Sequence, residues 1–146
     1  MKRMDSCFLG VAVGFLAYWA VTLLHLLPEA YLFKDYHDPA IAAWNWSFLP
    51  LDLFICAAGL SSFWLRRRGH RLASQAALVM LTLSFSSGLQ AIAFWVVRRD
   101  FDWAWWTPNL FLLLYPLFFL RAACLGGDEP RRAPRDRREV PPPPRA

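Results

Sequence analysis

Four long runs of apolar residues, separated by short polar stretches, set the pattern of this chain. They cover about residues 7–27, 45–65, 72–97 and 108–125, and each is long enough to cross a lipid bilayer as a helix. A soluble domain would instead carry its apolar residues in stripes, with polar residues between them to cover its outer surface. The pattern therefore predicts an all-α integral membrane protein, folded as an antiparallel four-helix bundle with short connections.

Helix-breaking residues support these boundaries. Pro28 ends the first run, because proline cannot continue a helix without the loss of a hydrogen bond. Thr107 and Pro108 are typical of an N-cap and a first helical position, so the fourth span is expected to begin there. The end of the chain is rich in arginine and proline and nearly free of apolar residues. We therefore expect residues 1–125 to form one transmembrane domain and residues 126–146 a disordered cytoplasmic tail.

The positions of the charges orient the predicted bundle. Four spans place both termini on one side, and thirteen of the 16 Lys and Arg residues then fall on that side. Since positive charge marks the cytoplasmic side, this predicts a multi-pass protein of the cell (cytoplasmic) membrane with both termini in the cytoplasm. The same rule accounts for the net charge of +5, so we expect the lipid bilayer as a partner and no nucleic acid. Six of the eight tryptophans lie near the outer side, either as anchors at the headgroups or as the rim of a ligand-binding mouth.

Polar and small residues recur at helical spacing within the runs, and they should face one another because lipid cannot satisfy their hydrogen bonds. Asp52 is the most costly of them, at roughly 2.5–3.5 kcal/mol on insertion scales. At a rise of about 1.5 Å per residue, Asp52 and Gln90 lie about 10 Å below the outer end of the bundle. Asn109 and His25 lie nearer to that end, and Glu29 follows just beyond the first run. These residues predict a ligand-binding pocket in the outer half of the bundle.

On the first run the inward stripe consists of Gly10, Gly14, Tyr18, Thr22 and His25, with Glu29 just past its end. On the second run the stripe consists of Asn45, Asp52, Cys56 and Gly59. On the third run it consists of Gln75, Thr82, Ser86 and Gln90, with Ser87 and Gly88 beside it. Two interpretations of Asp52 follow. As a structural residue, it hydrogen-bonds to Gln90, Asn109 or backbone and fixes helix register. As a functional residue, it is the counter-ion of a cationic ligand or an acid that carries protons, and the pocket is expected to take a small hydrophobic or amine ligand.

Other motifs narrow the function further. Gly10 and Gly14 form a GxxxG pair, which lets two helices approach closely, either within the monomer or in a homodimer. The sequence holds no G-x-S-x-G, P-loop, H-E-x-x-H or glycine-rich dinucleotide motif, and its three cysteines lack the spacing of a zinc site. We therefore expect no cofactor, no metal and no catalytic residue, and we favour a binding or accessory role over an enzymatic one.

Several segments carry a family resemblance: Pro28-Glu29, Tyr31–His37, Trp44–Asp52 and Pro108–Leu110. Through them the chain resembles the YvaD-type family of small bacterial membrane proteins, over about residues 8–121. This resemblance implies a bacterial four-span membrane protein, and it implies no activity.

A looser similarity, of architecture and not of motif, is to the emopamil-binding type of four-span protein, which holds sterol-like amines and in some members isomerises sterols. It implies an alternative function, the acid–base isomerisation of a lipid or sterol-like substrate by Asp52 with Glu29 or His25. A third hypothesis is an interaction subunit of a membrane complex, which would use Gly10 and Gly14 or the arginine-rich tail.

Overall fold

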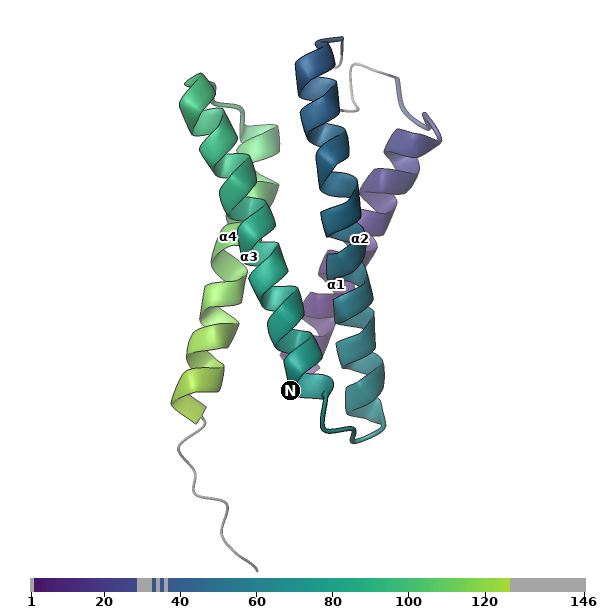
Figure 1. Cartoon of the computed structure of the whole chain (residues 1–146), viewed down its shortest axis with the longest axis vertical. Helices are drawn as coiled ribbons and strands as arrows, with labels where there is room; N and C mark the ends of the chain where they lie inside the picture. The colour runs from purple at the N-terminus through teal and green to yellow at the C-terminus, as the bar shows by residue number, and fades with distance from the viewer. Residues whose placement is uncertain (1, 29–32, 34, 36, 127–146) are drawn as a thin grey trace, which may run out of the picture.

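The computed structural model describes residues 2–28, 33, 35 and 37–126, and the regular secondary structure within these ranges is helical only. Helices α1 (Lys2–Leu23), α2 (Pro39–Arg67), α3 (Ala73–Arg98) and α4 (Trp103–Gly126) run alternately up and down, as Figure 1 shows. All four are long and apolar enough to cross a membrane. The prediction of a four-span, all-α bundle is confirmed, whereas the predicted tail lies, apart from Gly126, outside the described residues.

The outside of the bundle is apolar along all four helices. Val13 on α1, Phe54 on α2, Val97 on α3 and Phe118 on α4 are all exposed, the last two to 82% and 74%. Exposed apolar surface of this extent marks a surface that contacts lipid or another protein, and the length of the helices matches the thickness of a bilayer. The chain is therefore a multi-pass membrane protein.

Three helices begin earlier than the apolar runs predict: α1 begins at Lys2, and α2 and α4 begin early because aspartates cap them. Asp102 Oδ1 accepts a hydrogen bond from the Ala104 backbone N–H at 2.8 Å, so α4 begins directly after Asp102. Pro108 then lies inside α4, and its predicted place at the start of the helix is wrong. Asp38 caps α2 in the same way and moves the start of that helix to Pro39.

The first helix ends earlier than predicted. α1 stops at Leu23, and His25 then adopts a φ of 49°, in the left-handed region. The Leu26 backbone N–H donates to the Val21 carbonyl at 3.1 Å, which satisfies one of the last carbonyls of the helix. Pro28 therefore lies beyond the end of the helix and does not determine it.

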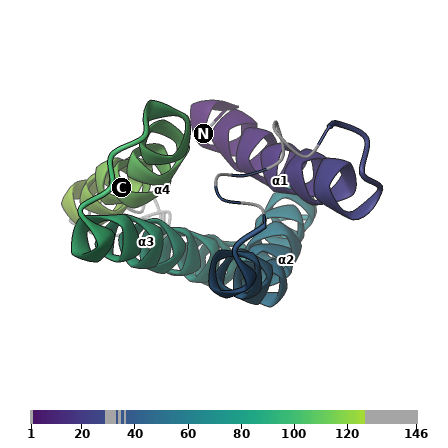
Figure 2. The ribbon, with the colours of Figure 1, turned by 90° about the horizontal axis from the view of Figure 1, so that it is seen from above.

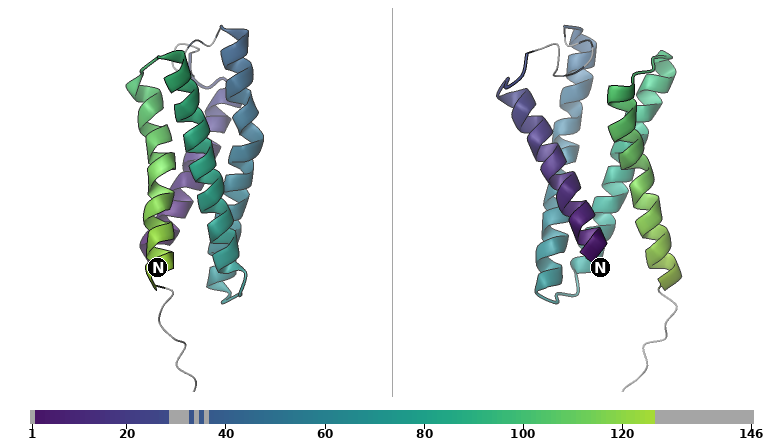
Figure 3. Two further views of the ribbon diagram at one scale, coloured as in Figure 1. Left: turned by 60° about the vertical axis from the view of Figure 1, so that its left-hand side comes forward. Right: turned by 180° about the vertical axis from the view of Figure 1, so that it is seen from behind.

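The helices pack in sequence order, with α1 on α2, α2 on α3 and α3 on α4. Seen from above, the four helices are arranged in a ring in this order, and α1 and α4 do not lie against each other along their lengths (Figure 2). The lower end of the bundle in Figure 1 holds the start of α1, the α2–α3 connection and the end of α4. Near this end Phe8 on α1 meets Phe119 on α4, with ring centroids 6.2 Å apart. Towards the upper end α1 and α4 diverge, as the right panel of Figure 3 shows.

The glycines of α1 and α3 differ in how closely other helices approach them. At Gly88 an added Cβ would lie 2.5 Å from the Leu113 backbone nitrogen and 2.7 Å from the Asn109 carbonyl oxygen, so α3 and α4 approach through their backbones. At Gly10 and Gly14 an added Cβ would meet no described atom within 4 Å. The predicted close approach of a second helix of the monomer to this GxxxG pair is therefore wrong. The use of the pair in a homodimer stays a prediction.

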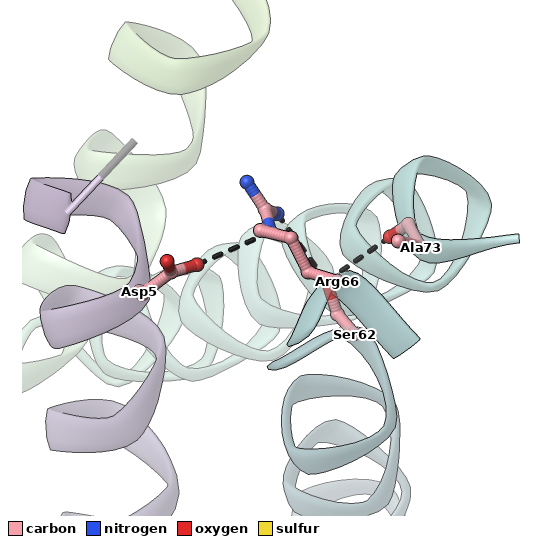
Figure 4. A network of polar contacts seen from close by, with 4 residues as sticks. All are labelled: Asp5, Ser62, Arg66 and Ala73. Carbon is pink, nitrogen blue, oxygen red and sulfur yellow. Dashed lines mark hydrogen bonds and ion pairs between the residues drawn. The ribbon is translucent and has the colours of Figure 1, made fainter. Parts of the chain in front are cut away.

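Polar contacts join three helices at the lower end (Figure 4). Ser62 Oγ donates to the Ala73 carbonyl at 3.1 Å, which links α2 to the start of α3. Arg66 Nη2 donates to Ser62 Oγ at 3.5 Å, and Arg66 Nε lies 3.2 Å from Asp5 Oδ1. Asp5 lies in the first turn of α1 and Arg66 in the last turn of α2, where the helix dipoles favour these charges. The network holds α1 against α2 at the end where α1 and α4 also meet.

Candidate functional site

Asp52 lies in the middle of α2 and is 4% exposed. Its Oδ2 accepts a hydrogen bond from Trp19 Nε1 of α1 at 2.9 Å, and its Oδ1 accepts one from Ser87 Oγ of α3 at 3.4 Å. These two donors connect three helices through one carboxyl group. Within the described part of the chain, the ion pairs of Arg66 and Arg98 involve other acids, and no cation pairs with Asp52.

A second pair of polar groups lies above Asp52 on the same faces of α1 and α2. The Tyr18 hydroxyl donates to Asn45 Oδ1 at 2.8 Å, and Thr22 Oγ1 donates to the Tyr18 carbonyl at 2.9 Å. Asn45 is 4% exposed, and its Nδ2 has no hydrogen-bond partner among the described residues. An amide donor that is buried without an acceptor costs about 1–3 kcal/mol, so this group has a strong requirement for an acceptor.

A cavity of about 460 Å³ opens beside these groups. All four helices contribute to its wall, which consists of Cys7, Gly10, Val11, Gly14, Phe15, Tyr18, Trp19, Trp44, Asn45, Phe48, Asp52, Ser87, Ala91, Trp105, Pro108, Asn109, Phe111 and Leu112. Seven of these residues are aromatic. The polar groups of the wall are few and lie together around Asp52 and Asn45, so the cavity is apolar over most of its length and polar in one region.

The structure brings together only part of the predicted pocket. Asp52 and Asn109 line the cavity, and so do Asn45 and Gly14, which the sequence had assigned to inward stripes. Asn109 Nδ2 donates to the Trp105 carbonyl of its own helix at 2.7 Å and not to Asp52. The whole predicted stripe of α2 is buried, which confirms the orientation of that helix.

The remaining predicted residues lie elsewhere. Gln90 is exposed and points out of the bundle, so it is not a partner of Asp52. His25 is exposed beyond the end of α1 and does not belong to the cavity wall. Glu29 lies outside the described residues. As a consequence, Asp52 is the only carboxylate among the described residues of the wall, and no histidine accompanies it.

The predicted stripe of α3 is wrong by about one residue of helical rotation, or roughly 100°. Its members Gln75, Thr82, Ser86 and Gln90 are all exposed, and the buried face instead consists of Ala73, Ala77, Met80, Leu81, Ser84, Ser87, Gly88, Ala91 and Trp95. Ser86 Oγ donates to the Thr82 carbonyl at 3.0 Å, so its hydroxyl is satisfied within α3 and needs no second helix. Small residues that allow close packing, and not the polar residues, determine which face turns inward.

Trp19 and Ser87 are the two functional residues that the sequence analysis missed as partners of Asp52. A tryptophan N–H seeks an acceptor when the ring is buried, and Trp19 lies next to Tyr18 on the inward stripe of α1. The position of Trp19 beside Tyr18 was therefore the feature of the sequence that could have identified it as a partner of Asp52. Ser87 had been placed beside the stripe of α3, so a packing argument based on Gly88 would have turned it inward.

The aromatic residues of the wall form part of a larger cluster at the upper end. The Trp44 ring stacks on Phe94 with centroids 4.1 Å apart, and Trp95 lies edge-on to Trp44 at 5.7 Å. Tyr18 of α1 lies edge-on to Trp105 of α4 at 6.5 Å. The outer tryptophans therefore do not share one role: Trp44 and Trp105 line the cavity, whereas others such as Trp103 are exposed.

The arrangement can bind a molecule that is apolar along its length and carries one polar group. The Asp52 oxygens can accept hydrogen bonds or face a positive charge, and the Asn45 amide can donate. Aromatic rings around them can contact a cation through their faces. Groups of three or more His, Cys, Asp or Glu residues, as a bound metal ion needs, do not occur within the described ranges.

Comparisons with known proteins identify the family of the chain but indicate no chemical activity. A model described as "Family of unknown function (DUF5360)" matches residues 4–129 of the chain. The chain is also similar to the "Uncharacterized protein YvaD" of Bacillus subtilis (strain 168), with 44% identity over 120 residues, which cover 82% of this chain and 90% of YvaD. No solved structure matches the chain significantly. The resemblance to YvaD-type proteins that the sequence motifs indicated is confirmed.

Proposed function

This chain belongs to the DUF5360 family, whose function is unknown, and we propose from its cavity that it is a membrane protein that binds an amphipathic amine. The cationic head of the ligand lies against Asp52 and the aromatic rings, and the apolar part fills the rest of the cavity. The observation that carries the proposal is the position of the buried Asp52 carboxylate, which has no cationic partner among the described residues, on the wall of one apolar cavity.

The free-energy cost of burying Asp52 in a membrane span supports the presence of a ligand. An acid in a membrane span costs roughly 2.5–3.5 kcal/mol on insertion scales, and two neutral donors at 2.9 and 3.4 Å do not supply an opposite charge. An ammonium group would supply it, and each contact of that group with the face of an aromatic ring contributes roughly 0.5–2 kcal/mol more. The cavity volume of about 460 Å³ falls within the range of about 300–1,000 Å³ that is typical of small-molecule pockets.

The ligand head is proposed to lie in the outer half of the cell membrane. The lower end of the bundle carries Arg66 and Arg67 in the last turn of α2 and Arg68 at its C-cap, whereas Arg98 and Arg99 are the arginines of the upper end. With the start of the chain and its arginine-rich end added, the positive-inside rule assigns the lower end to the cytoplasm. A reporter enzyme that is active only outside the cytoplasm, fused after residue 146, should then stay inactive; activity there would reverse the orientation.

The proposal is tested with two ligands that share an alkyl chain and differ in charge, dodecylamine and dodecanol. Their binding to the purified protein in lipid nanodiscs is measured through the fluorescence of its tryptophans. A charge-assisted contact of roughly 1.5–3 kcal/mol predicts that the amine binds at least about tenfold more tightly than the alcohol. Asp52→Asn should remove this preference, because it keeps the shape of the side chain and removes its charge.

Asp102→Asn is the matched control. It removes the same charge at the upper end of the bundle, and asparagine still caps a helix, so α4 and the amine preference should both be retained. If the wild-type protein binds both ligands equally, or if Asp52→Asn and Asp52→Leu keep the ligand profile and melt at higher temperature, Asp52 has a structural role only. The described residues of the wall include no second acid and no histidine for the isomerase hypothesis. This hypothesis and that of an interaction subunit stay predictions.

A further inference from the structure

The exposed residues of the cavity wall all lie on α1 and α4. Four of the wall residues are exposed, namely Gly10 and Gly14 on α1 and Pro108 and Phe111 on α4. The wall residues that α2 and α3 contribute are buried or half-buried. The opening therefore lies where the two helices do not pack together, on the side that faces the viewer in the right panel of Figure 3. We call these four residues the lateral opening.

Two aromatic pairs frame the lateral opening. Phe8 and Phe119 meet below it, with ring centroids 6.2 Å apart, and Tyr18 and Trp105 meet above it at 6.5 Å. Between these pairs the space is free, because a Cβ added at Gly10 or Gly14 would meet no described atom within 4 Å. The opening is thus a gap of limited height between two fixed contacts, and it lies at the depth of the lipid chains.

Resting on the proposed function, we infer that the ligand enters sideways from the bilayer through the lateral opening, and that its alkyl chain lies over Gly10 and Gly14 while its amine reaches Asp52. At this depth no water is present, so only a lipid-like chain or another helix can cover the gap. The described residues favour the chain, because Asp52 has only neutral donors among them. The amine head of such a ligand brings the opposite charge, which a glycine-bearing helix face would not.

The α1 side of the cavity wall also has the length and the apolar character that an alkyl chain requires. Trp19, which holds Asp52, and Cys7 both line the cavity and are twelve residues apart on α1, which corresponds to roughly 18 Å along the helix. The wall between them on α1 consists of Gly10, Val11, Gly14, Phe15 and Tyr18, so it is apolar below the tyrosine. An alkyl chain can therefore extend from the carboxylate towards the lower end, while its tail stays continuous with the surrounding lipid.

The test is a long-chain tertiary alkylamine that carries a photoreactive diazirine in its alkyl chain. It is added to the full-length protein in phosphatidylglycerol–phosphatidylethanolamine vesicles, and the labelled residues are identified by mass spectrometry with and without excess dodecylamine. We expect competed labels at the lateral opening and on its neighbours Phe15 and Leu112. Gly14→Leu fills the opening and should reduce these labels at least tenfold, whereas Ala20→Leu, on an exposed position outside the wall, should leave them unchanged.

The outcomes separate this inference from the proposed function. Competed labels confined to the upper aromatic residues, such as Trp44, with the amine preference intact, would mean that the ligand enters from the end of the bundle, and the lateral path would be wrong. A label that dodecylamine never displaces at any residue would contradict the proposed function itself. Cross-linked dimers that disappear in Gly14→Leu, without labels at the opening, would identify a second copy of the chain as its cover. The wild-type label map decides between these outcomes even if Gly14→Leu fails to fold.

Discussion

Gly88 and Gly14 predict opposite effects of the same substitution, and this contrast tests the geometry on which the cavity depends. At Gly88 the Cβ of an alanine would lie 2.5 Å from the Leu113 nitrogen and 2.7 Å from the Asn109 carbonyl oxygen. These are backbone atoms of α4, so they cannot rotate away as a flexible side chain can. At Gly14 the same Cβ would meet no described atom within 4 Å.

Two contributions determine how each substitution changes the free energy of unfolding. Overpacking of a close contact costs about 1–3 kcal/mol, and alanine in place of glycine in a helix returns about 0.5–1 kcal/mol. Gly88→Ala should therefore lower the free energy of unfolding by roughly 0.5–2 kcal/mol, because both terms act. Only the favourable term acts at Gly14, so Gly14→Ala should raise the free energy of unfolding by about 0.5–1 kcal/mol.

The assay is reversible unfolding of the purified protein in mixed micelles, with a denaturing detergent as the titrant and far-UV circular dichroism as the signal. Each variant is measured at two protein concentrations. A Gly88→Ala variant as stable as the wild type would refute the backbone contact between α3 and α4. A Gly14→Ala variant that is destabilised, and more so at low protein concentration, would refute the open position and indicate a dimer interface instead.

The remaining predictions concern single polar contacts. Trp19→Phe removes the shorter hydrogen bond to Asp52 and should cost about 1–3 kcal/mol of stability, measured in the same titration, while Trp46→Phe, at a half-exposed ring, should cost less. Tyr115→Phe removes the 2.8 Å hydrogen bond to Ser84 Oγ between α4 and α3, and should cost about 0.5–1.5 kcal/mol; no loss would mean that the serine finds a backbone partner. Asp5→Asn breaks the ion pair with Arg66, in which the Arg66 and Asp5 side chains are only 18% and 26% exposed, so it should cost about 1 kcal/mol or more, and high salt should weaken the wild type only in part.

The topology was predictable because it depends on lengths and on one-dimensional patterns. Four apolar runs of sufficient length gave four helices, and the turns between them fell near the charged stretches. The ends of the helices were less accessible, since they depend on single side chains. Asp38 and Asp102 cap helices whose first turns, residues 39–44 and 103–107, precede the predicted spans, and a hydropathy pattern does not locate the residue that caps a helix.

The site was only partly predictable, because the face that a membrane helix turns inward depends on packing as well as on polarity. On α2 the acid, the amide and the small residues lie on one face, so both criteria agree and the predicted stripe was correct. On α3 they disagree: Ser86 satisfies its hydroxyl within the helix, and Gly88 requires contact with α4. Packing then determines the rotation, which brings Ser87 to Asp52 and carries Gln90 outward.

Asp52 can be separated from an ordinary structural acid by what surrounds it. A carboxylate has about four sites that accept hydrogen bonds. If it only fixed helix register, donors at all of these sites would stabilise it most. Here two donors hold it from α1 and α3, and the space beside it is a cavity. Atoms that line an empty cavity lose dispersion contacts, and buried polar groups without partners lose hydrogen bonds. Each feature lowers the stability of a protein that binds no ligand. The proposed amine ligand would supply both the opposite charge for Asp52 and apolar atoms for the cavity.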